Sequence, residues 1–271
     1  MRPLILITND DGVFSPGLAA VAEAVQPLGD LLVVAPRWQQ TTMGRAFPRA
    51  AGIGRIERVA IRVHGAPVRA YGVVGSPAQA VAHAVLELAD RVPDLCISGI
   101  NYGENLGLSL TCSGTLGAAF EAHSQGVRAL AVSLATPLHL QHLQDYPAAD
   151  WTAAQRVTAL LAARILDRGL PEATSLLNVN VPEGATASTE IRLTRQSRFS
   201  HSVFTRPGPR PLEAGLQLRT ELNPELRSVE RDSDIHALCF DRVLSVTPIS
   251  WGLSANASMN FPYLEGGVPC A

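Results

Sequence analysis

The sequence predicts an α/β fold in which helices cover both faces of one doubly wound, mostly parallel β-sheet. Short runs of apolar residues have the length and the uninterrupted apolar character of strands buried on both faces; they lie at residues 4–7, 31–35, 95–98 and 129–134. Helix-length stretches alternate with these runs through the first two thirds of the chain. This order is typical of repeated βαβ units with right-handed crossovers.

The predicted helices begin with recognisable signals. Residues 16–25 form the first crossover helix, with Pro16 in its first turn. Residues 76–88 form another helix, which Ser76 caps and a proline begins. Residues 113–121 are expected to be the start of a third helix, and residues 151–170 are expected to form a fourth. A strand is expected at 176–181.

Two regions break this alternation. Residues 55–74 alternate apolar and polar side chains, which predicts an antiparallel hairpin at the edge of the sheet. Residues 191–235 are rich in arginine and proline and poor in apolar side chains, which predicts a projecting C-terminal arm. We therefore divide the chain into a catalytic core at 1–190, this arm, and a part at 236–271 that holds a return strand and a tail.

Composition restricts the possible partners and locations. The chain has 271 residues, 46% of them hydrophobic, and its formal net charge of −2 gives no reason to expect a bound nucleic-acid polymer. Its apolar runs are shorter than the roughly 18 residues that a membrane helix needs. The N-terminus has neither the long apolar stretch nor the cleavage site of a signal peptide. We expect a cytoplasmic protein that does not bind membranes.

All 22 basic residues are arginine, because the chain contains no lysine. This excludes a Walker-type phosphate loop, a pyridoxal Schiff base and any lysine nucleophile. The four cysteines lie far apart and form no C-x-x-C pair, so a structural zinc site or a disulfide framework is not expected. Any chemistry must come from carboxylates, amides, hydroxyls and arginine.

A pair of adjacent carboxylates follows the first predicted strand. Asn9, Asp10 and Asp11 come directly before Gly12, at the sheet edge where open α/β folds bind ligands. Adjacent carboxylates repel each other unless a cation lies between them, and oxygen ligands suit Mg²⁺ or Mn²⁺. We assign Asp10 and Asp11 to the metal and to catalysis, and Asn9 to the substrate. A simple Asp-Asp-Gly turn is the equally compatible alternative.

Two more features are expected at the same edge. The loops at 37–44 and 98–107 follow predicted strands, and the second is rich in glycine and amide side chains. Ser113, Gly114 and Thr115 open a helix, and a helix N-terminus with flanking hydroxyls favours a bound phosphate. A serine N-cap without any ligand is the alternative. Together the three features predict metal-assisted transfer of a phosphoryl group to water.

The motifs resemble those of the SurE (stationary-phase survival protein) family of nucleotidases over nearly the whole chain. This resemblance implies a Rossmann-like core and a homodimeric or homotetrameric assembly. It also implies one divalent ion, Mg²⁺ or Mn²⁺, per subunit and hydrolysis of nucleoside 5′- or 3′-monophosphates. The matching stretches are residues 8–17, 33–36, 75–78, 98–107, 113–115, 178–182, 194–196 and 245–248.

The resemblance also assigns roles to individual residues. Asp10, Asp11 and Asn101 match metal ligands of the family, and Thr41 occupies the position of a ligating serine. One aspartate would bind the metal and the other would orient or deprotonate a water molecule. In the arm, which would reach across to a second subunit, Arg195 would lie near the neighbour's phosphate site; an arm that is only a solvated, mobile loop is the alternative. The positions expected near the substrate phosphate are Asn105, Ser113 and Thr115, with Gly114 between the last two.

Two other functions remain open at this point. A haloacid-dehalogenase-like phosphatase would use aspartate as a nucleophile, but it needs two aspartates separated by one residue and a downstream basic residue, usually lysine. A catalytically silent nucleotide-binding or assembly module would keep the fold without activity. Two changes motivate the second alternative: Thr41 stands where the family has serine, and Gln79 stands where it has aspartate.

Overall fold

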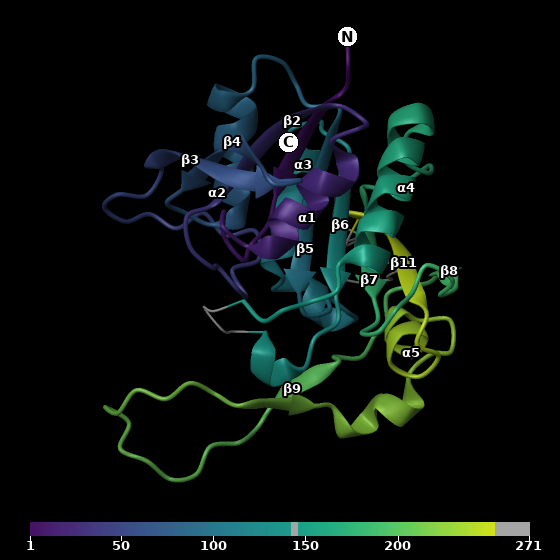
Figure 1. The fold of residues 1–271 in the computed structure, drawn as a ribbon. Helices are drawn as coiled ribbons and strands as arrows, with labels where there is room; N and C mark the ends of the chain where they lie inside the picture. The colour runs from purple at the N-terminus through teal and green to yellow at the C-terminus, as the bar shows by residue number, and fades with distance from the viewer. Residues whose placement is uncertain (142–145, 253–271) are drawn as a thin grey trace, which may run out of the picture.

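The computed structural model describes residues 1–141 and 146–252, and its centre is a nine-stranded sheet (Figure 1). The strand order is β3-β4-β2-β1-β5-β6-β7-β11-β8. Neighbouring strands from β4 to β7 are parallel, so the predicted doubly wound, mostly parallel sheet is confirmed. The central strands are β1 (Leu4–Thr8), β2 (Asp30–Pro36), β5 (Leu95–Tyr102), β6 (Ala129–Leu134) and β7 (Leu176–Val181).

Antiparallel pairs lie toward both ends of the sheet. At one end, β3 (Ile56–Val63) pairs antiparallel with β4 (Ala66–Val73), which confirms the predicted hairpin. At the other end, β11 (Leu244–Ile249) pairs antiparallel with β7 and parallel with the edge strand β8 (Ile191–Leu193). The first residues of the predicted arm are therefore part of the main sheet.

Helices cover both faces of the sheet and form two apolar cores. The alternating side chains of β1 show the division, because Ile5 and Ile7 pack in one core and Leu6 in the other. The first core lies under α1 (Pro16–Val25) and α4 (Thr152–Arg168), and the second under α2 (Pro77–His83) and α3 (Gly114–Ser124). Both faces of β1 are therefore buried from solvent, which explains its uninterrupted apolar sequence. None of the described helices is long and apolar enough to cross a membrane.

One predicted helix is divided. The stretch 76–88 begins as α2 but continues as a π-helical segment, η1 (Ala84–Leu88), in which the N–H of Ala89 donates to the carbonyl of Ala84. An i→i+5 bond widens the last turn, and apolar periodicity over so few residues does not distinguish it from an α-turn. Gln79 completes the capping box of α2 with Ser76, so its side chain has a structural partner.

The arm forms a ribbon and a small satellite core. The ribbon pairs β9 (Ser202–Phe204) with β10 (Thr220–Leu222), and the loop between them extends away from the body (Figure 1). At its base, η4 (Pro224–Ser228) leads to α5 (Asp234–Cys239). The satellite core contains Leu106, Val229, Ile235 and Leu238, with Phe199 and Leu226 packed against it. The remaining short helices are η2 (Leu108–Thr111) and η3 (Leu138–Leu140).

Candidate metal and phosphate site

The predicted ligands meet where the strand order reverses. From the central strand β1 the chain continues to β2 on one side, whereas β5, β6 and β7 follow on the other. Asp10 and Asp11 follow β1, and Asn101 lies near the end of the neighbouring strand β5. Crevices at such switch points, beyond the carboxyl ends of the strands, are the usual ligand sites of open α/β sheets.

The loop after β1 is held by its own asparagine. The Nδ2 group of Asn9 donates to the Gly12 carbonyl, and its Oδ1 accepts from the Gly12 N–H, both at 3.1 Å. Gly12 has a φ of +109°, and a Cβ atom at this position would lie 3.3 Å from the backbone carbonyl carbon of Trp38 and 3.4 Å from the backbone nitrogen of Gln39. Asn9 is fully buried and fixes the loop that presents the two aspartates, and its predicted contact with the substrate stays a prediction.

Asp10 lies directly against the start of α3. Its Oδ1 accepts a hydrogen bond of 2.7 Å from the hydroxyl of Thr115. A Cβ atom on Gly114 would lie 2.7 Å from the Cβ of Asp10 and 2.8 Å from its Oδ2, closer than atoms tolerate. Glycine at position 114 is therefore what allows the helix N-terminus to approach the carboxylate.

Asp11 receives donors from two other segments. Its Oδ2 accepts from the backbone N–H of Tyr102 at 3.2 Å, and the nearby side chain of Gln39 partly offsets the effect of burial on the pKa of the carboxylate. The hydroxyl of Tyr146 donates to the Asp11 carbonyl at 2.7 Å. The two hydrogen bonds fix Asp11 from the β5 side and from the segment before α4.

The two carboxylates carry an electrostatic cost that a cation would remove. Burial raises the pKa of Asp10 to about 6, although the hydrogen bond from Thr115 lowers it. Burial and the neighbouring charge of Asp10 raise the pKa of Asp11 well above its usual range. Within residues 1–141 and 146–252, no arginine or histidine forms an ion pair with either aspartate. A divalent ion is the partner that this arrangement fits.

The raised pKa of Asp10 predicts how stability depends on pH. Between the unfolded value of 3.8 and about 6, the folded protein binds more protons, so the free energy of unfolding should fall as pH rises. Saturating Mn²⁺ should reverse this trend, because the ion binds the deprotonated pair. Denaturant unfolding of the wild type and Asp10→Asn, with and without metal, measures both slopes. Identical slopes in the two metal-free proteins would show that Asp10 is not responsible.

Asn101 and Thr41 complete the predicted ligand set. The pairing of β5 with β6 shifts register between Ser98 and Asn101, and such irregularities re-aim side chains near functional sites. Asn101 Nδ2 donates to the Gly103 carbonyl at 2.7 Å, and its Oδ1 accepts no hydrogen bond from the part of the chain described. Thr41 is partly exposed and follows Gln40, whose N–H donates to the Asp10 carbonyl at 2.7 Å.

A ligand set of two carboxylates, one amide and one hydroxyl suits Mg²⁺ or Mn²⁺, which keep several water or substrate oxygens in their shell. The described residues contain no group of three or more His, Cys, Asp and Glu side chains placed to hold a metal. The carboxylate pair with neutral oxygens is an arrangement that fits a hard cation.

The residues expected near the phosphate lie next to Asp10. Ser113 caps α3, because its Oγ accepts from the Leu116 N–H at 3.1 Å. Asn105 Nδ2 donates to Ser133 Oγ at 2.9 Å and to Thr115 Oγ1 at 3.3 Å. Asn105, Thr115 and Asp10 thus form one connected network.

Sequence reasoning missed the residues that support this network. Asn178 and Asn180 donate through Nδ2 to the Asn105 carbonyl at 2.9 and 3.0 Å, and Asn180 Oδ1 accepts from the Asn105 N–H at 2.7 Å. Both asparagines lie in the stretch 178–182 that resembles the family, and two asparagines two residues apart on a fully buried strand share one face; these were the available signals. Gln39, which lies near Asp11, had no comparable signal.

Arg195 lies outside this network. Its side chain is 84% exposed and pairs with Asp232 at 3.4 Å. No hydrogen bond or ion pair among the described residues joins it to Asp10 or Asp11. Its predicted role at the phosphate site of a neighbouring subunit stays a prediction.

Comparison with known proteins identifies the family. The family model described as "Survival protein SurE" matches residues 5–203. A protein of Methanocella arvoryzae named 5′-nucleotidase SurE is 40% identical over 259 residues, covering 93% of each chain. One of the same name from Methanothermobacter thermautotrophicus is 42% identical, covering 82% of this chain and 88% of its own. The crystal structure of a SurE protein from Aquifex aeolicus superposes with a TM-score of 0.71 at 27% identity, covering 93% of this chain and 95% of its own. The chain belongs to the survival protein SurE family.

Proposed function

We propose that this protein is a divalent-metal-dependent phosphomonoesterase that hydrolyses nucleoside 5′- or 3′-monophosphates. The relatives named 5′-nucleotidase SurE support the substrate class. The single observation that carries the chemistry is the buried pair Asp10 and Asp11, which has no cationic partner in the described chain and lies against the N-terminus of α3. A metal-bound phosphate placed there would meet both the ion and the helix N–H groups.

Different groups of the site would bind the metal, bind the phosphate and accept a proton. Asp10, Asp11, Asn101 and the hydroxyl of Thr41 would hold the ion, which supplies charge neutralisation and a water of lowered pKa. The first turn of α3 would bind non-bridging phosphate oxygens through its free N–H groups. An aspartate oxygen not used by the metal would accept a proton from the attacking water.

Phosphate release by the chelator-treated protein tests this function. We expect no hydrolysis of AMP or 3′-AMP until Mn²⁺ or Mg²⁺ is restored. A protein that hydrolyses no nucleoside monophosphate with either metal would instead be a silent binding module. Acid quenching during turnover separates the remaining alternative, because an aspartyl nucleophile would leave a trapped phosphoenzyme and a metal-activated water would not.

Thr41 should contribute its hydroxyl to the metal, directly or through water. Thr41→Ser keeps the oxygen and should retain or improve metal affinity. Thr41→Val removes the oxygen at nearly constant shape and should weaken metal binding by about tenfold. Titration of Mn²⁺ by calorimetry measures both. A valine variant with wild-type affinity would leave Thr41 outside the ligand set.

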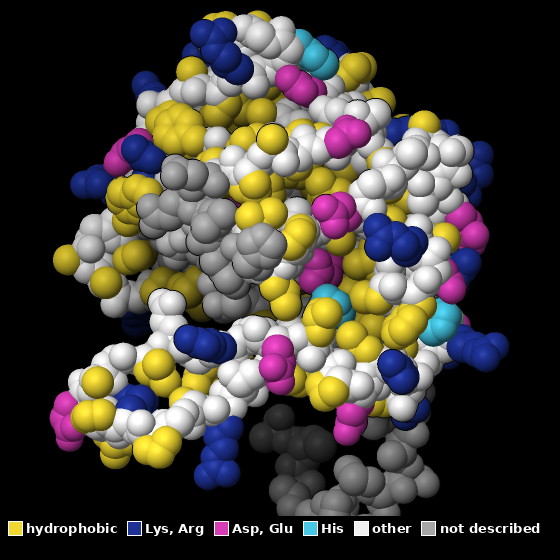
Figure 2. Space-filling view, turned by 60° about the horizontal axis from the view of Figure 1, so that its bottom comes forward, with side chains coloured by type: hydrophobic (Ala, Val, Ile, Leu, Met, Phe, Trp, Pro, Cys, Tyr) yellow, Lys and Arg dark blue, Asp and Glu magenta, His cyan; other side chains and the backbone are white. Residues whose placement is uncertain are grey.

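We also propose that the arm joins two or more copies of the chain. Apolar side chains on the projecting segment are exposed to solvent, and the space-filling view shows them interspersed with arginine and acidic groups (Figure 2). They are Phe204, Leu212, Leu216, Leu218 and Leu222. Exposed apolar groups on an extension favour exchange of this element between identical subunits, with Arg195 near the partner's phosphate site.

Shortening the arm tests this role. Phe199 and Leu226 pack in the satellite core, so the change is confined to residues 206–218, replaced by Asn-Gly between Thr205 and Arg219. We expect a folded chain that loses its association, measured by light scattering. An unchanged oligomeric state together with unchanged catalytic efficiency would show that the projecting loop is passive.

A further inference from the structure

Asp234 is a buried carboxylate outside the metal site, and its partners in the described chain are all backbone groups. It begins α5 at the base of the arm and is fully buried. Its Oδ2 accepts from the Gly107 N–H at 2.9 Å, and its Oδ1 accepts from the N–H groups of Ser197 and Ile235 at 2.9 and 2.8 Å. Because a buried carboxylate is costly without donors around it, these three N–H groups are what stabilise it there.

Gly107 is the residue through which the arm contacts the β5 loop, residues 103–107, which follows β5 and contains Asn105. Gly107 has a φ of +54°, and a Cβ atom there would lie 2.1 Å from the Phe199 carbonyl oxygen. Its own carbonyl accepts from Gln196 Nε2 at 2.9 Å. The N–H and the carbonyl of Gly107 are therefore both held by side chains of the arm, and glycine allows this close approach.

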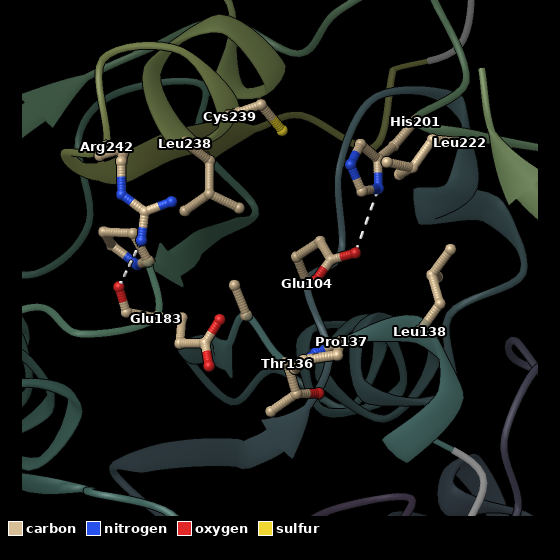
Figure 3. Close-up of a pocket in the computed structure, with 12 residues that line it drawn as sticks. Glu104, Thr136, Pro137, Leu138, Glu183, His201, Leu222, Leu238, Cys239 and Arg242 are labelled. Carbon is tan, nitrogen blue, oxygen red and sulfur yellow. Dashed lines mark hydrogen bonds and ion pairs between the residues drawn. The ribbon is translucent and has the colours of Figure 1, made fainter. Parts of the chain in front are cut away.

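A buried ion pair also joins the arm to the β5 loop. His201, which lies just before β9, has its Nδ1 atom 3.1 Å from Glu104 Oε1, and the two side chains face each other (Figure 3). Burial alone would lower the pKa of His201, but Cys239 and Glu104 raise it to about 10, so the imidazole is charged at neutral pH. The arm therefore holds the β5 loop near both of its ends.

The β5 loop in turn places Asn105 beside the carboxylate pair. Asn105 Nδ2 donates to Thr115 Oγ1 at 3.3 Å, and the Thr115 hydroxyl donates to Asp10 Oδ1 at 2.7 Å. The asparagines of β7 fix the backbone of Asn105, and Gly107 is the next fixed point, at most about 7 Å further along the chain. The orientation of the Asn105 amide should therefore depend on both attachments.

We propose that Asp234 is a positioning residue, which aims Asn105 at the substrate phosphate by binding the Gly107 N–H; this rests on the function proposed above. Asp234 itself touches neither the substrate nor the ion. Because Asp10 and Asp11 are presented by a different loop, the effect of Asp234 falls on phosphate binding rather than on metal binding. The arm then supports the site of its own subunit, in addition to its predicted contact with a neighbour.

Asp234→Asn tests this role at nearly constant shape. One carboxylate oxygen becomes an NH₂ group, so at least one of the three N–H groups loses its acceptor. In the Mn²⁺-loaded protein, the dissociation constant of inorganic phosphate, measured by calorimetry, and KM for AMP should both rise about tenfold. Affinity for Mn²⁺ itself should change by less than about twofold. Gln196→Leu removes the donor to the Gly107 carbonyl and should raise the same two phosphate values about threefold.

Ser233→Ala controls for damage to α5. Ser233 Oγ caps this helix by accepting from the His236 N–H at 3.1 Å, and it forms no hydrogen bond with the β5 loop in the described chain. Loss of the cap weakens the helix that carries Asp234, but it leaves the contact with Gly107 in place. We expect Ser233→Ala to bind phosphate as tightly as the wild type.

The outcomes separate positioning from a general structural role. Unchanged phosphate affinity in a folded Asp234→Asn, or in Gln196→Leu should the first variant not fold, would overturn the proposal. An equal loss of phosphate affinity in Ser233→Ala, or an equal loss of Mn²⁺ affinity in Asp234→Asn, would also contradict it. A wild type that binds Mn²⁺ but neither binds phosphate nor hydrolyses AMP would instead reject the phosphatase function itself.

Discussion

Asp11→Asn should lower kcat/KM for nucleoside monophosphates by at least about a thousandfold, and Asp10→Asn should have a comparable effect. Each change removes one negative charge from the pair that would bind the ion, and loss of the metal removes both charge neutralisation and the activated water. The variants should remain folded. Since burial raises the pKa of both carboxylates, replacing one with a neutral amide should preserve or increase the stability of the metal-free protein.

This combination distinguishes a metal site from a structural turn. The control is Asp167→Asn, because the Asp167 side chain is 74% exposed and lies on α4, away from the sheet edge. It should match the wild type in activity and in stabilisation by Mn²⁺. Substantial activity in Asp10→Asn or Asp11→Asn, or stabilisation by Mn²⁺ equal to that of the wild type, would contradict the assigned role of the pair.

Gly114→Ala should reduce kcat by about a hundredfold without unfolding the protein. The added methyl group would lie 2.7 Å from the Cβ of Asp10 and 2.8 Å from Oδ2, so either the carboxylate or the start of α3 must move. Overpacking of this kind costs about 1–3 kcal/mol of stability, whereas small displacements of catalytic groups have large effects on rate.

The matched control for this substitution is Gly208→Ala. A Cβ at Gly208 meets no atom within 4 Å, so the same change in backbone freedom occurs there without a collision. Measurement of kcat and of the denaturation midpoint for both variants separates rate from stability. A Gly114→Ala variant with wild-type kcat would show that the close contact between α3 and Asp10 is not required for turnover.

The sequence predicted the sheet well because its central strands are buried on both faces. The run before Asp10 is apolar for this reason, and the Asp10–Asp11 pair could be placed at the correct edge from strand order alone. The start of the helix at Ser113–Thr115 was expected at the same edge, and the structure shows the hydroxyl of Thr115 bonded to Asp10.

Features that depend on contacts between distant segments could not be predicted in this way. The hydrogen bonds from Asn178 and Asn180 to the backbone of Asn105 join residues more than 70 positions apart in the sequence. The contact of His201 with Glu104 likewise joins the segment before β9 to the segment after β5. The hydrophobic pattern of a single helix or strand does not predict such contacts, because they depend on loop geometry and tertiary packing.

The central claim is that Asp10 and Asp11 hold a divalent ion with Asn101. Crystals grown with Mn²⁺ and measured at a wavelength where manganese scatters anomalously test it most directly, because the signal locates the ion without reference to activity. The account predicts one anomalous peak per subunit, about 2.0–2.3 Å from carboxylate oxygens of this pair and within ligand distance of Asn101 Oδ1. A peak at other residues, or none at an Mn²⁺ concentration that supports turnover, would contradict the account.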